Sequence, residues 1–262
     1  MKPLYRKSLG ALVLVAGCAI WLISSSLWVR SRRMRTCTGK ETLDVRVLDS
    51  AERRFVATED VASWLEKEYR AYAGMQLDSV DLDRIETIIR SHSAVRDCQA
   101  WLTDDGSLHV ALNQRQPVIR FQDGQKGYYA DASGFLFPLQ RRGSVQVPVV
   151  DGKLPLKVKR GYKGYPDTEA EKDWLTQMIQ MVLYMRQTPW ADNISQISAD
   201  ENGNLVLIPR EGKERFLFGP PVRVAEKFGL LDNYYESILP AKGAGYYATV
   251  DVRYRKQLVC RK

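Results

Sequence analysis

The residues of this sequence that could carry out chemistry are few and widely spaced. Cys98 and His109 are the best candidates for a nucleophile and its base, since an imidazole can activate a neighbouring thiol. Asp131 is an isolated acid, with no second carboxylate at a fixed spacing for general acid and base catalysis. No set of His, Cys, Asp or Glu residues has the spacing of metal ligands. Whether any of these residues can react depends on the elements that position them.

A predicted hairpin determines whether Cys98 and His109 can lie next to each other. Residues 95–102 and 107–112 flank Asp104-Asp105-Gly106, which fits a three-residue loop with its glycine in the left-handed conformation. That register places one set of apolar residues on a single face: Cys98, Ala100, Leu102, Leu108, Val110 and Leu112. His109 lies on the opposite face, so the thiol and the imidazole cannot meet.

The remaining motifs also argue against an enzyme. The sequence has no P-loop, no glycine-rich dinucleotide fingerprint and no Cys-x-x-Cys. Asp131 precedes Gly134 in a stretch that favours an Asx turn with the glycine at positive φ. We therefore predict a protein without catalytic residues, cofactor, metal or small-molecule substrate.

The charge of the chain is concentrated at one end. The formal net charge is +8, but residues 1–35 hold seven of the 39 Lys and Arg and no acid. Beyond them, 32 basic residues nearly balance 31 acidic ones, so no basic stripe remains for nucleic acid. The basic residues flank an apolar stretch instead, which suits anionic lipid headgroups. Cys37, Cys98 and Cys260 lie outside that stretch and allow at most one disulfide.

The apolar stretch is Leu9–Val29, which contains no charged residue. Its length gives roughly 30 Å of helix, the thickness of a bilayer core. Trp21 and Trp28 lie toward one end, where indole rings meet lipid headgroups. We expect a transmembrane helix over residues 9–29 that contacts the lipid bilayer, between a short tail (1–8) and a juxtamembrane linker (30–42).

Two processed forms are alternatives to this anchor. Lys2, Arg6 and Lys7 could begin a secretory signal peptide, although no small-x-small cleavage site follows the apolar run. Val15-Ala16-Gly17-Cys18 resembles a lipobox, although the apolar run continues past the cysteine. The intact mass of the membrane form would distinguish an uncleaved anchor from a lipid attached at Cys18.

Residues 43–117 have the pattern of a small β-α-α-β-β module. Residues 43–48 alternate as a half-buried strand, one helix begins near Thr58, a second begins near Asp81, and the hairpin follows. Pro117 ends the ladder because it has no N–H to donate.

This module resembles a POTRA (polypeptide-transport-associated) domain. Its C-terminal end, Val110-x-Leu112-x-Gln114-Arg115-x-Pro117, is similar to the V-x-V-x-E-R-x-P sequence at the end of that domain in the FtsQ/DivIB family of bacterial division proteins. Gln114 replaces the usual acid. The second half continues the resemblance through Asp131-x-x-Gly134, through Pro148-Val149-Val150-Asp151-Gly152 and through a closing strand at residues 246–254 that is similar to the family's V-D-L-R-Y.

Between these motifs the chain alternates strands and helices. Helical spacing covers residues 169–186 and 222–239, the second helix ending at Pro240, and strand patterns cover 192–198, 205–208 and 215–218. We predict an α+β fold in which residues 118–254 form a mixed, mostly antiparallel, β-rich domain that ends in an edge strand. Residues 255–262 are expected to be a C-terminal tail.

The resemblance implies a function in cell division. It implies a single-pass inner-membrane protein with a cytoplasmic N-terminus and most of its chain in the periplasm. Such proteins link cytoplasmic and periplasmic division proteins by recruiting FtsB- and FtsL-type coiled-coil partners, which regulate septal peptidoglycan synthesis.

The predicted binding site is the last strand, 246–254, placed at a sheet edge. A partner could add there as one more strand, because an edge exposes unpaired N–H and C=O groups. Arg253 would pair with a partner acid and Tyr254 would be an aromatic anchor. The predicted partner-binding residues are Thr249, Val250, Asp251, Val252, Arg253 and Tyr254. Alternatively, this strand only closes the sheet.

Two other functional classes remain open at this point. POTRA-type modules also serve in envelope transport and assembly, usually as several copies or before a barrel, and neither is present here. The lipobox-like motif would instead indicate a lipid-anchored envelope protein.

Overall fold

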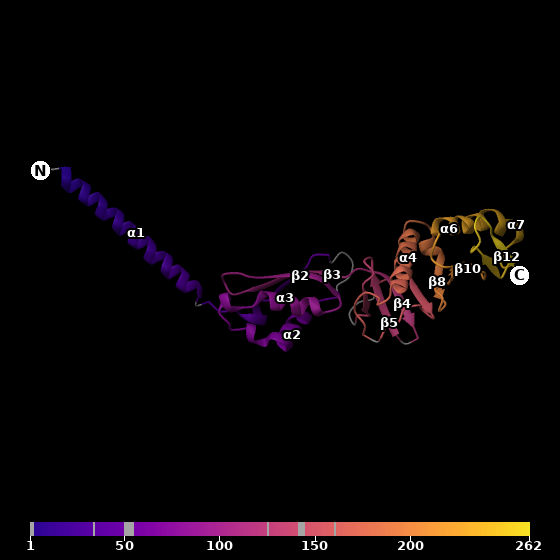
Figure 1. The fold of residues 1–262 in the computed structure, drawn as a ribbon, viewed down its shortest axis with the longest axis horizontal. Coiled ribbons are helices and arrows are strands. Elements are labelled where there is room, and N and C mark those ends of the chain that lie inside the picture. The colour runs from indigo at the N-terminus through magenta and orange to yellow at the C-terminus, as the bar shows by residue number, and fades with distance from the viewer. Residues whose placement is uncertain (1–2, 34, 50–54, 125, 141–144, 160) are drawn as a thin grey trace. The chain divides into compact units, whose positions relative to one another are not determined.

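The computed structural model describes residues 3–33, 35–49, 55–124, 126–140, 145–159 and 161–262. The chain divides into two compact units, Met1–Gln114 and Arg115–Lys262. Figure 1 shows the elements of the first in indigo to magenta and those of the second in rose, orange and yellow.

The first unit begins with helix α1 (Pro3–Arg33), which covers the apolar stretch of the sequence. Within the residues that the structure describes, no helix is long and apolar enough to cross a membrane. The membrane-spanning helix that we expected over residues 9–29 is therefore not found in the described part of the chain.

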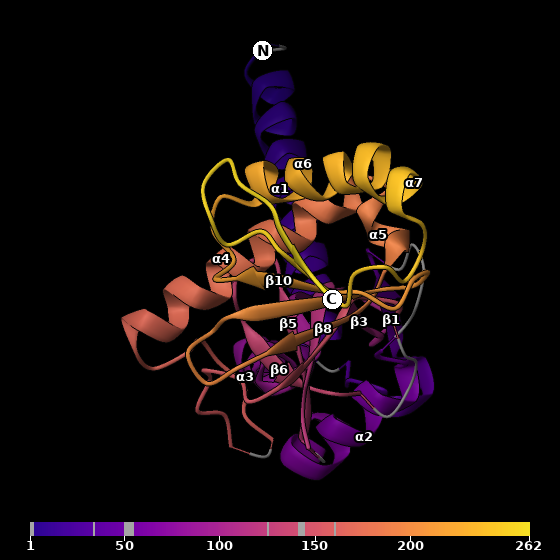
Figure 2. The same cartoon turned by 90° about the vertical axis from the view of Figure 1, so that its right-hand side faces the viewer.

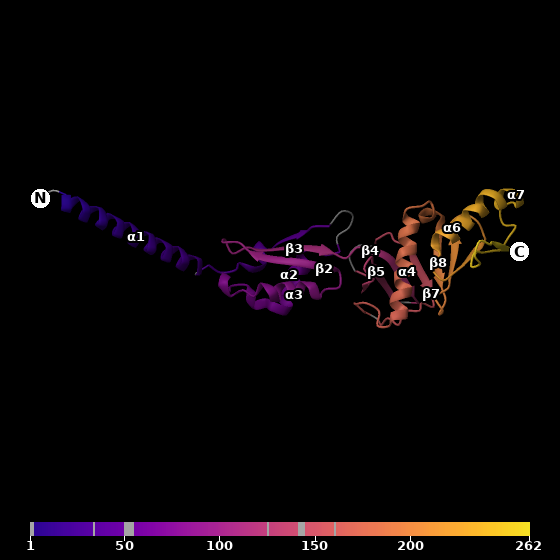
Figure 3. The ribbon, with the colours of Figure 1, turned by 45° about the horizontal axis from the view of Figure 1, so that its top comes forward.

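The rest of the first unit has the predicted β-α-α-β-β order. After a 3₁₀ turn, η1 (Gly39–Thr42), its elements are β1 (Asp44–Val47), α2 (Thr58–Tyr69), the 3₁₀ turns η2 (Arg70–Tyr72) and η3 (Leu77–Ser79), α3 (Leu82–Ser91), β2 (Val95–Leu102) and β3 (Leu108–Gln114). The sheet order is β1-β3-β2, with β1 parallel and β2 antiparallel to β3. Both helices pack on one face of the sheet (Figure 3), where α3 buries Ile85 and Ile89 and β3 buries Val110 and Leu112.

The hairpin register is confirmed. Cys98 pairs with Leu112 and Ala100 with Val110, and Gly106 has a φ of 92°. Gln114, which stands where the related family has an acid, is fully buried. Its Oε1 accepts the N–H groups of Phe55 and Val56, at 2.6 and 2.9 Å. An amide oxygen can replace a carboxylate in this acceptor role, which explains why the substitution is compatible with the fold.

The second unit is a nine-stranded mixed sheet covered by helices on one face (Figure 2). Its first half contains β4 (Pro117–Asp123), β5 (Lys126–Asp131), β6 (Leu136–Pro138), β7 (Val149–Gly152), α4 (Glu169–Arg186) and α5 (Trp190–Asn193). Its second half contains β8 (Ile194–Ala199), β9 (Leu205–Pro209), β10 (Arg215–Gly219), α6 (Val224–Asn233), the π-helix η4 (Tyr234–Ile238), α7 (Leu239–Lys242), β11 (Thr249–Asp251) and β12 (Val259–Arg261).

The strand order is β12-β11-β10-β9-β8-β7-β4-β5-β6. Neighbouring pairs are antiparallel except β4–β7, β7–β8 and β10–β11, so the sheet is mixed and mostly antiparallel, as predicted. The core lies between the sheet and the helices, where Trp174, Met178 and Phe228 pack against Phe121 and Phe216. The α+β fold class is confirmed in both units.

One predicted boundary in this unit is wrong. The second long helix does not end at Pro240, because the chain continues as η4 and then α7, with the proline in the first turn of α7. A first-turn proline is tolerated there since its missing N–H has no partner within that turn. The helical spacing of residues 169–186 also predicts Leu183 on the apolar face of α4, but Leu183 is exposed, and Met181 and Met185 are buried.

The most important correction concerns the last strand. Strand β11 lies between β10, to which it is parallel, and β12, to which it is antiparallel, so residues 246–254 do not form the edge of the sheet. The edge strand is β12, within the segment that we expected to be a tail. The chain turns back after Asp251 because residues 252–258 form a tight turn in which Lys256 has a φ of 52°.

Candidate protein-binding edge

The six predicted binding residues lie in very different environments. Val250, Asp251 and Val252 are completely buried, and Thr249 is half-buried. The main chain at both ends of this segment is hydrogen-bonded to the neighbouring strands. The Ala248 N–H donates to the Arg261 carbonyl at 2.8 Å, and the Val252 N–H donates to the Leu217 carbonyl at 3.1 Å. Partner contact through their side chains is therefore restricted to Arg253 and Tyr254, the two that are exposed.

Arg253 already has a carboxylate partner within the chain. Its Nε and Nη2 donate to Oδ1 and Oδ2 of Asp251, at 2.8 and 2.7 Å, a two-pronged contact. The Arg253 N–H also donates to Oδ1 of Asp251. The hydrogen bonds from Arg253 lower the pKa of Asp251 against the effect of burial, and they raise the pKa of Arg253. In the isolated chain this arginine therefore stabilises a buried acid of its own chain. We had expected it to pair with an acid of the partner.

The surface beside β12 is cationic and aromatic. Lys262 Nζ lies 4.3 Å from the ring centre of Tyr246, which is 41% exposed and packs edge-on against Tyr247. Arg255, Lys256 and Arg261 are also exposed. Cys260 on β12 faces the core opposite Val250, so Val259 and Arg261 lie on the other face of the strand.

Two other sheet edges are covered by the chain itself. On β2, Glu86 Oε1 accepts the Ala100 N–H at 2.9 Å and Arg90 Nη2 donates to the Cys98 carbonyl at 3.3 Å. On β6, Leu136 and Gly164 exchange both main-chain hydrogen bonds. Strands β1 and β12 end their sheets without a further strand in the described part of the chain.

Of these two uncovered edges, β12 has the surroundings of a binding surface. The charged side chains on β1 are engaged with each other, since Asp44 Oδ2 accepts from Arg46 Nε at 3.0 Å and contacts His109 Nδ1 at 3.1 Å. The cationic and aromatic side chains beside β12 are exposed. Edge main chain with such neighbours is suited to strand addition.

The sequence candidates for chemistry are separated or used in the fold. Cys98 is buried beneath α3, where burial raises its pKa to about 11, and His109 stacks on Trp101 across the sheet. Asp131 forms the predicted turn, accepting the N–H groups of Ser133 and Phe135 at 2.9 and 3.1 Å. It also pairs with Arg115 at 2.8 Å. The predicted separation of Cys98 and His109 and the turn role of Asp131 are confirmed.

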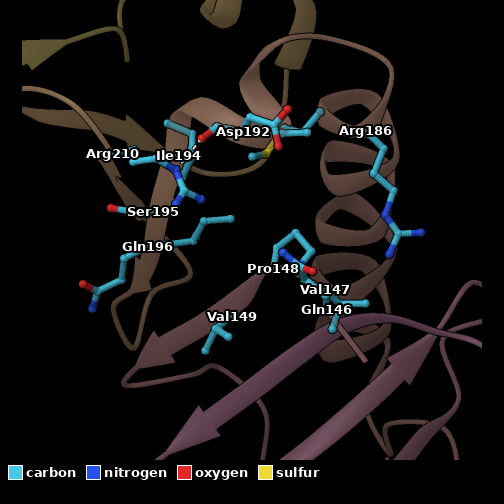
Figure 4. Close-up of a pocket in the computed structure, with 13 residues that line it drawn as sticks. Gln146, Val147, Pro148, Val149, Arg186, Asp192, Ile194, Ser195, Gln196 and Arg210 are labelled. Carbon is cyan, nitrogen blue, oxygen red and sulfur yellow. Dashed lines mark hydrogen bonds between the residues drawn. The ribbon is translucent and has the colours of Figure 1, made fainter. Parts of the chain in front are cut away.

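A cavity of about 360 Å³ lies between the start of β8 and the segment that leads into β7 (Figure 4). Ser195 is its one hydroxyl, and this Oγ donates to the carbonyls of Ile208 and Pro209 at 3.0 and 3.1 Å. Among the described residues that line the cavity there is no His, Cys or Lys to act as a base. The Ser195 hydroxyl is therefore engaged with main-chain carbonyls of β9.

Within the residues that the structure describes, a small β-α-α-β-β module is thus followed by a mixed sheet with one uncovered edge, at β12. Family models match both units: residues 36–113 match the POTRA-like domain, and residues 116–261 match the domain described as FtsQ/DivIB, C-terminal related. The second match covers more than half of the chain, which therefore belongs to the FtsQ/DivIB family of cell-division proteins. No curated protein matches the chain. Both matched families are non-enzymatic scaffolds.

Sequence reasoning missed the residues that form the edge itself. Val259, Cys260 and Arg261 make a strand too short for a recognisable alternation, and the Lys262–Tyr246 contact joins positions far apart in the sequence. The signal that could have found β12 is Lys256-Gln257, a polar turn between the aromatic strand 246–254 and the apolar run Leu258-Val259-Cys260.

Proposed function

We propose that this protein is a scaffold of the bacterial division machinery that binds protein partners by β-strand addition to the outer edge of β12. The single observation that carries the proposal is the uncovered margin at β12, while the edges of β2 and β6 are closed by the chain itself. Main-chain hydrogen bonds supply affinity in this mode, and alternate side chains supply selectivity.

The partners are FtsB- and FtsL-type coiled-coil proteins, as the family membership suggests. Tyr254 and Tyr246 supply exposed aromatic surface beside the added strand, and Arg261 and Lys262 supply positive charge. Strand β11 supports this edge from within the sheet. Through the partners, the scaffold links cytoplasmic and periplasmic division proteins.

The experiment is site-specific photo-crosslinking of the full-length chain in membranes. A photoreactive residue at Arg261 on β12 should crosslink to the partner, whereas one at Gln99 on the closed edge of β2 should not. Crosslinking from Gln99 alone would contradict docking at β12. A chain ending at Tyr254, which lacks β12, should lose the partner in a pull-down.

The proposed location is the inner membrane, with a cytoplasmic N-terminus and residues 9–29 as the anchor. Its support is the family membership of the chain and the uncharged sequence Leu9–Val29, in which Leu14, Trp21 and Trp28 are each more than half exposed. The hydroxyls of Ser24 and Ser25 donate to main-chain carbonyls three residues earlier, both at 2.9 Å, so they need no water.

Alkaline carbonate extraction tests this location. We expect the chain to stay with the membrane, and a variant lacking residues 9–29 to be released. Release of the intact chain would contradict the anchor, and a lipid mass on Cys18 would replace it by a lipoprotein.

A further inference from the structure

Two residues with unusual backbone geometry lie on the two segments that meet beside the docking edge. In the described part of the chain, Arg223 and Lys256 are the residues other than glycine with positive φ, at 54° and 52°. Residues with a Cβ rarely adopt this backbone conformation, and it persists only where the surrounding structure enforces it. Arg223 immediately precedes α6, and Lys256 lies in the turn between β11 and β12.

One carboxylate joins these two residues. Glu226 Oε1, in the first turn of α6, accepts the Lys256 main-chain N–H at 2.9 Å and Arg223 Nη1 at 3.2 Å. Arg223 Nη2 in turn donates to the Arg253 carbonyl at 2.7 Å. We call Arg223, Glu226 and Lys256 the latch. It connects the start of α6 to Arg253 and Lys256 in the turn 252–258.

The surroundings hold the α6 side of the latch in place. Lys227, which is fully buried, donates to the Pro220 carbonyl at 2.6 Å, so the segment before α6 is fixed to the helix. A Cβ at Gly219 would lie 2.9 Å from Cγ of Arg253, so the Arg253 side chain packs directly over this glycine. The hydrogen bond from Lys256 also lowers the pKa of Glu226, so the carboxylate is charged at neutral pH.

We propose that Glu226 is a positioning residue for partner binding: it keeps the β11–β12 turn in a strained conformation and thereby holds β12 as the outer strand. Strand β12 has only three residues, so its pairing with β11 is weak without the turn. When the latch opens, Lys256 relaxes to negative φ and β12 leaves the sheet. The inference rests on the docking edge proposed above, and Glu226 itself does not touch the partner.

The test measures the edge directly by amide hydrogen exchange in the full-length chain. Glu226→Ala should speed the exchange of amides in residues 248–261 by roughly tenfold, while amides of α4 exchange as before. Partner binding should weaken by a similar factor. Glu226→Gln keeps an acceptor oxygen and should show a smaller effect on both.

Relief of the backbone strain at Lys256 distinguishes the positioning role of Glu226 from an ordinary packing role. Glycine adopts positive φ freely, so Lys256→Gly in the Glu226→Ala background should restore both the protection of β12 and partner binding. Arg255→Gly, which alters the neighbouring exposed residue, is the matched control and should restore neither. If Glu226→Ala alone fails to fold, the double variant compared with Lys256→Gly still reports whether the carboxylate matters once the strain is gone.

The outcomes separate the two proposals. Unchanged exchange over residues 248–261 in Glu226→Ala would overturn the latch, whatever happens to binding. Rescue by Arg255→Gly as well as by Lys256→Gly would also overturn it. Faster exchange with unchanged partner binding would leave the latch as a structural device and overturn docking at β12, and with it the role of Glu226 in binding.

Discussion

At the scale of single residues, two buried charged groups of the second unit, Asp251 on β11 and Lys227 on α6, have opposite effects on stability. Asp251 is a buried carboxylate with a full set of donors from Arg253. Lys227 is a buried ammonium whose Nζ contacts the Pro220 carbonyl and lies 4.6 Å from the ring centre of Phe218. The first is compensated by an opposite charge and the second is not, so their substitutions should change stability in opposite directions.

Lys227→Met should raise the free energy of unfolding at pH 7 by about 1–3 kcal/mol. Burial lowers the pKa of Lys227 from 10.5 to about 8, so the native state disfavours its charged form. Stability therefore rises with pH between about 8 and 10.5 in the natural chain, and the penalty is fully present below pH 8. In the variant the Pro220 carbonyl still accepts the Val222 N–H, at 2.8 Å, so it is not left without a hydrogen bond.

Urea unfolding at a series of pH values checks this expectation. The advantage of Lys227→Met should shrink as the pH rises from 8 to 10.5, the range given by the two pKa values. A pH-independent difference would mean that packing, and not the buried charge, controls stability at this position.

Arg253→Met should lower the free energy of unfolding by about 2–3 kcal/mol, because it leaves the Asp251 carboxylate buried without its partner. Arg253 lowers the pKa of Asp251, so this stabilisation is present above the ordinary value of 3.8 and is lost as the pH falls through the lowered one. The deficit of the variant should therefore narrow in acid. Thermal melts at pH 7 and pH 3 measure it, and Arg255→Met, on an exposed side chain, should melt like the natural chain.

Tyr254→Ala should separate binding from folding. Its side chain is 46% exposed, so the unfolding free energy should change by less than about 0.5 kcal/mol. Partner affinity should fall, since the ring is proposed to contact the added strand. A loss of melting temperature together with binding would instead assign Tyr254 to the fold.

At the scale of elements, the chain treats its sheet edges differently. Side chains from α3 cover the outer edge of β2, and Gly164 covers that of β6. Uncovered edges promote association between sheets, so covering the edges of β2 and β6 leaves fewer places for unwanted pairing.

Glu86→Ala should therefore make the chain self-associate. The change frees the Ala100 N–H on the edge of β2 and also removes the Arg90–Glu86 pair. Light scattering across a concentration series should show a larger mean mass than for Thr87→Ala, an exposed change at the next position of α3. Equal masses for the two variants would show that the Glu86 side chain of α3 does not prevent pairing at the edge of β2.

The sequence predicted elements best where the pattern was long. The helix 169–186 and the hairpin register agree with the structure, because each buries a repeated apolar face. Strand β12 was missed because three residues carry no periodicity, and because the turn before it is fixed by a contact distant in sequence, the hydrogen bond that the Lys256 N–H donates to Glu226 of α6. Arg253 was predicted to pair with a partner acid, and its pairing with Asp251 of the same chain could not be inferred without the positions of the neighbouring strands, which bury Asp251.

At the scale of the whole molecule, each unit has its own core. Ile85 and Ile89 of α3 belong to the first, and Trp174 and Phe216 belong to the second. Compact units with separate cores unfold as separate cooperative steps when few contacts join them.

Ile89→Ala should lower the stability of the first unit by about 2–5 kcal/mol, since this side chain is fully buried. Hydrogen exchange should show faster opening of β2 and β3, with the amides of α4 and β8 unchanged. Equal acceleration in both units would show that they unfold as one.

The connection between β10 and β11 has a kinetic consequence. The two strands are parallel neighbours, and residues 220–248 cross over between them through α6, η4 and α7. Joining β10 to β9 closes only a tight hairpin, whereas joining β11 to β10 closes a long loop and requires the helices to dock first. In refolding from denaturant, protection of the Val250 amide should therefore appear after that of Leu207. The edge proposed for docking would then be the last part of this unit to mature.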